Sequence, residues 1–272
     1  MSVVRYFHRD ARHYQILTLS LLFLYQLVVS DFSSGVLTLL ITVSSLCGIQ
    51  YIATKFVDAG TFDLKSPWIT ALSLTLLLKT NFLWLFPVAG LFAILSKFCL
   101  RVKGKHIFNP ANIAIVALLL LLPNMVWVSP GQWGNAIWFA FILLFLSGFV
   151  LGKATRVDTA LFFFCVYSFL VFGRALWLGD PLDIPLHQLQ SGALLIFTFF
   201  MITDPRSTPD HRIGRALFVM SVAVLGFVLQ FSFQIREGLF YALAIISLIR
   251  PCIDAVFVSQ RFEWIKQKEE KL

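Results

Sequence analysis

Long apolar segments follow one another along almost the whole chain, with only short polar connectors between them. A helix needs about 20 residues to cross a hydrocarbon core of about 30 Å, and most segments have that length, whereas the third and the eighth are shorter. The segments leave no room for a soluble domain. The sequence therefore predicts an all-α integral membrane protein whose residues 1–272 form a single domain. The ten segments fall at about 14–30, 35–53, 66–79, 82–99, 110–128, 133–152, 157–178, 188–203, 213–233 and 238–258.

The composition agrees with a membrane protein that uses its basic residues for orientation. Hydrophobic residues make up 58% of the chain and charged residues 13%, against about 25% charged residues in a soluble domain. The net charge is +8, but the basic residues stand in short clusters between the apolar segments, as orientation signals do. The expected partner is the lipid bilayer, and no nucleic-acid partner is predicted.

The distribution of lysine and arginine predicts the topology. If the N-terminus is cytoplasmic, ten spans place eighteen basic residues inside and only Lys79, Arg174 and Arg236 outside. Such an excess on the inner side is typical of multi-pass proteins. The sequence therefore predicts ten spans in a bacterial inner (plasma) membrane, with both termini in the cytoplasm.

Ten spans also divide into two sets of five, and an odd set reverses its direction across the membrane. Two related halves, residues 14–128 and 133–258, would then be inverted repeats. The short segments occupy corresponding places in the two halves, third and eighth. The sequence predicts an inverted five-helix repeat with short or broken helices.

Two motifs beside the short segments are the candidate site. Pro205 cannot continue a helix and restricts Asp204 before it, so the eighth segment ends at Thr203-Asp204-Pro205. The fifth segment begins at 109–112, where Asn109 can cap a helix whose first residue is Pro110, and Asn112 follows one turn later. Short segments in corresponding places of two halves point to a membrane binding site. Two interpretations remain open: both motifs are helix ends only, or they bind a ligand or ion.

Other polar residues receive simpler interpretations. Glu237 precedes the last segment, where the helix dipole favours an acid, and is expected to cap that helix. Arg250 either extends to the inner headgroups, which is the favoured interpretation, or pairs with Asp254. The four cysteines have no metal-ligand spacing and are expected to be small buried hydrophobes. No metal site is predicted, and the loop motifs of soluble nucleotide-binding enzymes are absent.

Three blocks of this sequence resemble the NqrB/RnfD membrane subunits of sodium-pumping NADH:quinone oxidoreductase and the Rnf electron-transport complexes. The first is Asn109-Pro110-Ala111 with the two residues before it, and the last is Glu237-Gly238 followed by Pro251 and Asp254. The middle block, Phe-Phe-Met-x-Thr-Asp-Pro-x-Ser over residues 199–207 and ending at Ser207, is the most specific. The resemblance covers about residues 60–258 and implies a ten-helix fold with flavin-linked electron transfer. It assigns the site to Asn109, Pro110, Asn112, Thr203, Asp204, Pro205, Ser207 and Glu237.

One departure from the family concerns its flavin. Members that carry covalent FMN attach it to the threonine of a Ser-Gly-Ala-Thr motif in a long outer loop after the Asn-Pro-Ala helix. Here that loop shortens to residues 128–134 and lacks the motif, and Ser-Gly-Ala-Leu at 191–194 lies in the wrong segment. No covalent FMN is therefore expected, and the protein resembles a compact, divergent member.

Two functions remain open on this basis. In the first, the protein is an electron-transferring subunit that binds FMN or riboflavin non-covalently and works with other membrane redox subunits, coupled to ion movement. In the second, it is a stand-alone channel or transporter for a small molecule or ion that uses the same fold. A role as a scaffold within a complex is a third alternative.

Overall fold

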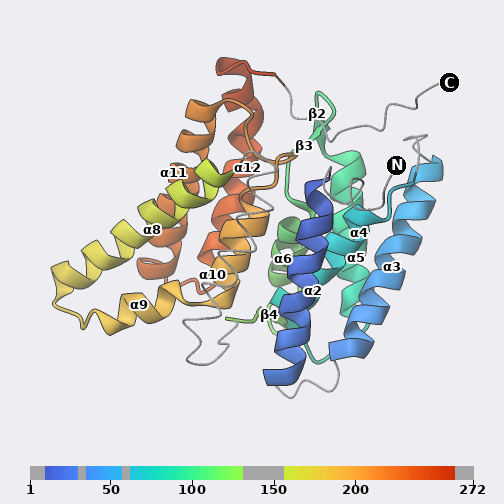
Figure 1. Ribbon diagram of the computed structural model, residues 1–272, viewed down its shortest axis with the longest axis horizontal. Coiled ribbons are helices and arrows are strands. Elements are labelled where there is room, and N and C mark those ends of the chain that lie inside the picture. The colour runs from blue at the N-terminus through green and yellow to red at the C-terminus, as the bar shows by residue number, and fades with distance from the viewer. Residues whose placement is uncertain (1–9, 30–34, 57–61, 131–155, 261–272) are drawn as a thin grey trace.

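The computed structural model of the protein describes residues 10–29, 35–56, 62–130 and 156–260, and it is mainly helical (Figure 1). The expected segment 133–152 lies outside these residues. The first part of the chain contains α2 (Ala11–Val29), α3 (Gly35–Phe56), α4 (Lys65–Leu77), β1 (Leu78–Thr80), α5 (Leu85–Cys99), β2 (Arg101–Val102), β3 (Lys105–His106), α6 (Pro110–Leu121) and β4 (Val126–Val128). The second part contains α8 (Val157–Leu178), α9 (Asp183–Leu189), α10 (Gly192–Ile196), the π-helix η1 (Phe197–Met201), α11 (Arg212–Phe231) and α12 (Gly238–Val256).

The helices form two packed groups that meet at α6 and α12. In the first group α3 packs against α4 and α5, α2 against α4, and α5 against α6. In the second group α11 packs against both α8 and α12. Figure 1 shows the first group in blue and green beside the second in yellow to red, and α6 contacts α12 where they join.

The short elements form the interior and the long helices surround them. All of η1 and the stretch of α4 from Thr70 to Leu77 are buried. The long helices turn large apolar side chains outward, such as Phe169 and Trp177 of α8, which are 77% and 88% exposed. Exposed apolar surface of this kind would be unfavourable in water and is expected where the neighbour is lipid.

Within the described part of the chain, four helices are long and apolar enough to cross a membrane: α3, α8, α11 and α12. A fifth span results if α9 and the α10–η1 helix, which meet at a bend of 50°, are taken together. The helices α5 and α6 are apolar but shorter. The predicted class, a mainly helical multi-pass membrane protein, is confirmed apart from the short strands, whereas the count of ten spans and the inverted repeat stay predictions.

Two expected helices are shorter than predicted because each gives way to a strand of a small two-stranded antiparallel sheet. The segment 66–79 ends as a helix at Leu77 and continues as β1, and the segment 110–128 ends at Leu121 and continues as β4. The strands pair Leu78 with Val128, and the Ser129 N–H donates to the Leu77 carbonyl at 2.8 Å. Pro123 explains the end of α6, because it disfavours helical backbone at the residue before it. Apolarity alone did not predict this strand pairing.

The eighth segment is broken as well as short. The predicted start at 188 is wrong, because α9 ends at Leu189 and a new helix, α10, begins at Gly192. The helix then widens to η1, in which the Ile202 N–H donates to the Phe197 carbonyl at 3.0 Å, five residues back. Such π-turns are uncommon and occur frequently at functional sites. This one delivers Thr203 and Asp204 into the interior of the protein.

Candidate functional site

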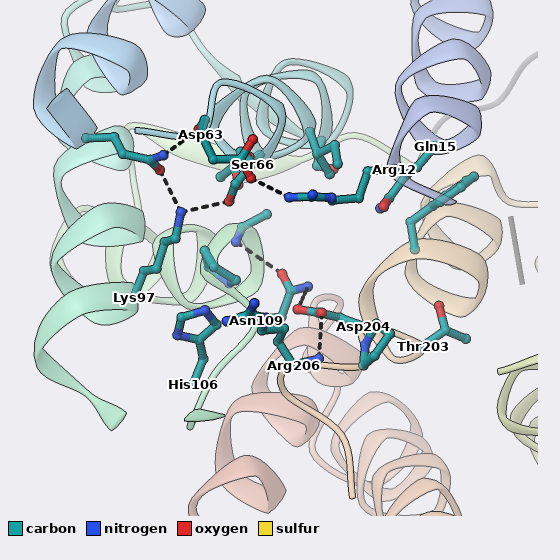
Figure 2. Close-up of a pocket in the computed structure, with 18 of the residues that line it drawn as sticks. Arg12, Gln15, Asp63, Ser66, Lys97, His106, Asn109, Thr203, Asp204 and Arg206 are labelled. Carbon is teal, nitrogen blue, oxygen red and sulfur yellow. Dashed lines mark hydrogen bonds and ion pairs between the residues drawn. The ribbon is translucent and has the colours of Figure 1, made fainter. Parts of the chain in front are cut away.

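A cavity of about 290 Å³ lies where the two helix groups meet. Figure 2 shows its polar lining. The first group contributes the start of α2, the first turns of α4, the end of α5 and the start of α6, and the second contributes η1 and the turn after it. Of the sequence-predicted residues, Asn109, Pro110, Thr203, Asp204 and Pro205 line this cavity. The structure therefore brings together the two motifs that the sequence singled out.

Asn109 caps α6 as predicted. Its side-chain oxygen accepts hydrogen bonds from the backbone N–H groups of Ala111 and Asn112, each at 3.1 Å, and Pro110 is the first helical residue. Because the cap uses the oxygen, the side-chain amide nitrogen remains available as a donor. It donates to Asp204 Oδ2 at 3.3 Å. Asn109 thus joins the start of α6 to the end of η1 across 95 residues of sequence.

Asp204 occupies the turn after η1 and is held by three donors. Its carboxylate accepts from the Arg206 N–H at 3.0 Å, from Ser207 Oγ at 3.2 Å and from Asn109. Burial raises the pKa of Asp204, and the hydrogen bonds from Arg206 and Ser207 oppose that rise. The carboxylate is half-buried and faces the cavity (Figure 2). It is therefore positioned to accept a hydrogen bond or to face a positive group of a ligand.

The other predicted residues near this turn have structural contacts. The Thr203 hydroxyl donates to the Phe199 carbonyl at 2.6 Å, and Ser207 supports Asp204 from behind. Asn112 lies one turn deeper in α6 and donates to the Phe240 carbonyl of α12 at 3.1 Å. Its buried Oδ1 has no hydrogen-bond partner among the described residues. Thr203 and Ser207 therefore stabilise the turn that carries Asp204, and Asn112 links α6 to α12.

Glu237 is the predicted residue that the structure places elsewhere. Glu237 is the residue before α12, as expected. Its side chain makes no hydrogen bond to the first turn of the helix, so the prediction that it caps α12 is wrong. It lines a second cavity of about 690 Å³ with Tyr167, Gln230 and Phe240. The start of α6 lines the first cavity, and the start of α12 lines the second. The second cavity is also lined by Val128 of β4, the strand that follows α6. The predicted site is thus divided between two cavities.

Sequence reasoning missed the cations of the first cavity, because it interpreted them as orientation signals. Arg12, Lys97, Arg101 and Arg206 all line it, together with His106. Burial, helped by the positive charges of Arg101, Lys97 and Arg206, lowers the pKa of His106 to about 3. The imidazole is therefore neutral at physiological pH. Its buried Nδ1 has no partner among the described residues.

A buried ion cluster holds the loop that follows Asp204. Lys105 of β3 donates to the Thr208 carbonyl at 2.5 Å and pairs with Asp210 at 2.8 Å. Arg156, before α8, donates to the Pro209 carbonyl at 2.9 Å and pairs with Asp210 at 3.2 Å. The loop is therefore attached both to the first helix group and to α8.

The same cluster overturns the favoured interpretation of Arg250 from the sequence. Arg250 is buried and pairs with Asp254 at 2.6 Å, so the favoured extension to the headgroups is wrong and the alternative pairing is confirmed. The reason is that Arg250 faces the interior of the protein from α12.

The cysteines are also less buried than predicted: Cys47 is half-buried, and Cys99, Cys165 and Cys252 are exposed. On exposed faces of a membrane helix an apolar thiol is compatible with lipid.

Comparison with known proteins finds similarity to the family suggested by the motifs of the chain. The model of the NQR2, RnfD, RnfE family matches residues 130–263, which include the Asp204 turn, Glu237 and Asp254. Over these residues, about half of its length, the chain is similar to this family. The matched region contains all of the second helix group, whereas Asn109 lies outside it.

Curated relatives extend the likeness into the first helix group. A protein of Halorhodospira halophila is 26% identical over 70% of this chain and 72% of its own length. One of Stutzerimonas stutzeri is 25% identical over 71% of this chain and 73% of its own length. A protein of Pseudomonas aeruginosa is 36% identical, but over only 29% of this chain and 24% of its own length. The name of each describes it as a subunit of an ion-translocating oxidoreductase complex.

Proposed function

We propose that this protein is a membrane subunit in flavin-linked electron transport, coupled to ion movement, that binds its flavin non-covalently in the cavity beside Asn109 and Asp204. The observation that carries the proposal is the Asn109–Asp204 contact. Two blocks of family resemblance, far apart in sequence, meet there at one cavity. The names of the relatives, subunits of an ion-translocating oxidoreductase complex, support the same class of function.

The lining of the cavity suits a flavin. An isoalloxazine ring is planar and apolar on its faces, and its edge carries both hydrogen-bond donors and acceptors. Phe98, Phe199 and Phe200 supply aromatic surface, while Asn109 and Asp204 supply a donor and an acceptor at one edge. The buried, unpartnered Nδ1 of His106 is a further polar group that a ligand can satisfy. The volume of about 290 Å³ lies just below the range of about 300–1,000 Å³ that is usual for small-molecule sites.

In this function the protein supplies binding and electrostatics, and the flavin supplies the capacity to accept and donate electrons. Asp204 and Asn109 would hold the polar edge of the ring, and the phenylalanines would exclude water from its faces. The chain has no Ser-Gly-Ala-Thr acceptor, so the flavin would be held by these contacts alone. Further membrane redox subunits are the proposed partners, because the relatives are named as subunits of a complex.

The experiment is to purify the protein in mild detergent from flavin-replete cells and to record its visible absorption spectrum. We expect flavin bands that move to the supernatant when the protein is denatured, because the binding is non-covalent. Titration of the purified protein with FMN and riboflavin should quench flavin fluorescence. Protein that carries no flavin and binds neither compound would overturn the proposal.

A second candidate is a channel or transporter, and the two cavities favour it. The first cavity lies at the start of α6 and the second at the start of α12. The buried η1 helix lines both: Phe199 and Phe200 line the first cavity, and Phe197 lines the second. This arrangement is typical of transport proteins with broken helices. Solute-driven swelling of proteoliposomes that contain flavin-free protein would support this candidate, and swelling equal to that of empty liposomes would reject it.

A further inference from the structure

Lys97 differs from the buried cations of the ion cluster in its partners. Its ammonium donates to Gln50 Oε1 at 2.6 Å and to Ser66 Oγ at 2.8 Å, both uncharged (Figure 2). Among the described residues no carboxylate lies within ion-pair distance of it. By contrast, Lys105 and Arg250 each pair with a carboxylate. A partly buried charge without a counter-ion is unfavourable, and this one faces a cavity.

The surroundings of Lys97 are also positive. Four cations line the cavity, Arg12, Lys97, Arg101 and Arg206, against the two acids Asp63 and Asp204. Asp63 is already paired with Arg12, and Asp204 accepts hydrogen bonds from three neighbouring groups. The cavity therefore has an excess of positive charge. Low-dielectric walls strengthen the attraction of such a cavity for an anion.

A neutral histidine completes this side of the cavity. His106 belongs to the β2–β3 hairpin that follows α5, and Figure 2 shows its ring below Lys97, whose ammonium points away from it toward Ser66. Its Nδ1 is buried and has no partner among the described residues. An unpartnered polar atom at a buried position indicates a missing ligand or water. His106 lines the same cavity as Lys97, whose ammonium has no carboxylate within ion-pair distance among the described residues.

We propose that Lys97 binds the phosphate group of a ligand in this cavity, with His106 as a neighbouring hydrogen-bonding group. The inference rests on the proposed function in one respect: among flavins, the cavity would select FMN over riboflavin, which lacks the phosphate. The same chemistry could come from the headgroup of an anionic phospholipid of the inner leaflet. The experiments below separate these sources.

The first experiment compares FMN with riboflavin by fluorescence quenching in wild type and Lys97→Gln. A charge-assisted hydrogen bond changes an equilibrium constant by about 10- to 150-fold. We expect wild type to bind FMN at least about 10-fold more tightly than riboflavin, and Lys97→Gln to bind the two equally. The matched control is Lys55→Gln, because Lys55 is exposed at the end of α3 and is not among the residues that line the cavity.

The second experiment does not need a flavin. Thermal unfolding is measured with inorganic phosphate in the buffer, and in nanodiscs of phosphatidylglycerol or phosphatidylcholine. Phosphate should stabilise wild type and Lys55→Gln but not Lys97→Gln. Stabilisation by phosphatidylglycerol that depends on Lys97 would identify a lipid headgroup as the source of the phosphate.

The outcomes separate the inference from the proposed function. Equal binding of FMN and riboflavin by wild type, with no effect of phosphate or anionic lipid, keeps the flavin site and overturns the phosphate site. If phosphate stabilises the protein through Lys97 but no flavin binds, the phosphate site is kept and the flavin site is overturned. Misfolding does not confuse the result, because glutamine removes a partly buried charge that has no counter-ion, and without ligand the variant should melt at or above the wild-type temperature. A variant that melts lower than wild type without phosphate, and is stabilised by phosphate as wild type is, would overturn the proposal.

Discussion

Asp210 is the residue whose replacement tests most directly how the loop after Asp204 is held. Its carboxylate pairs with Lys105 at 2.8 Å and with Arg156 at 3.2 Å, and the three side chains are 11%, 7% and 2% exposed. Asp210→Asn keeps the size of the side chain and removes its charge. Two buried cations then lose their main counter-ion.

The expected magnitude follows from that burial. Removal of one partner of a buried ion pair destabilises a protein by about 3–5 kcal/mol. The lower end applies here, because Lys105 keeps Asp254 at 3.5 Å and Arg156 keeps the Pro209 carbonyl. For a chain of this size 1 kcal/mol corresponds to roughly 2–4 °C in melting temperature. We expect Asp210→Asn to melt about 6–12 °C below wild type.

Asp180→Asn is the matched control. Asp180 pairs with Arg174 at 3.3 Å, but both side chains are 35% exposed. Solvent screens such a pair, and its removal is expected to change stability by less than about 1 kcal/mol. The assay heats detergent-solubilised protein and measures the monodisperse fraction by size-exclusion chromatography. Equal melting temperatures for the two variants would refute the role assigned to the cluster.

Four further predictions concern the site and the topology. Asp204→Asn should fold to normal yield and weaken flavin binding about 10- to 150-fold, because a charge-assisted contact is lost; unchanged affinity at normal yield would leave Asp204 a helix end only. The folded pKa of His106, about 3 against a reference value of 6.5, means that the unfolded chain binds the proton first as pH falls. Wild type should therefore lose roughly 1.5 kcal/mol more stability than His106→Asn between pH 6.5 and pH 5, and parallel stability curves in chemical denaturation would contradict this. The protein co-expressed with a flavin transferase should give no fluorescent band on a denaturing gel, and such a band at its mass would show a covalent flavin. Reporter fusions after residues 131 and 210 should report outside and inside respectively, and the same side for both would reject the predicted topology.

The parts of the site that could be predicted are those fixed by local backbone chemistry. The start of α6 follows from an asparagine before a proline, and the end of η1 from an aspartate before a proline. Their meeting across the cavity depends on the packing of α6 against the second helix group, which a single sequence does not contain. The family resemblance named both blocks but gave no geometry. Glu237 shows the same limit, because it belongs to the resemblance and yet lies in the other cavity.

Charged residues were harder to interpret than apolar ones. Lys97 and Arg101 end an apolar segment and were counted as orientation signals, a role that does not exclude lining a cavity. Arg250 was expected to extend to lipid headgroups because it lies near a helix end, whereas its direction is set by which face of α12 is buried. The strands β1 and β4 were missed for a related reason. A continuous apolar run does not reveal where a helix gives way to extended backbone.

The contacts between the two helix groups limit how the protein can move. Asn109 contacts Asp204, Asn112 contacts the Phe240 carbonyl, and Lys105 contacts Thr208 and Asp210. All three link the stretch from β3 to α6 with the second group. A rocking motion of one group against the other would have to break this row of contacts together, including a buried ion pair. At the other end of α6, beyond β4, the contacts between the groups are hydrogen bonds from the Ser191 hydroxyl and the Ala193 N–H to the Pro130 carbonyl, with no ion pair among the described residues. Opening between the groups is therefore expected to be easier at the β1–β4 end of α6 than at its start.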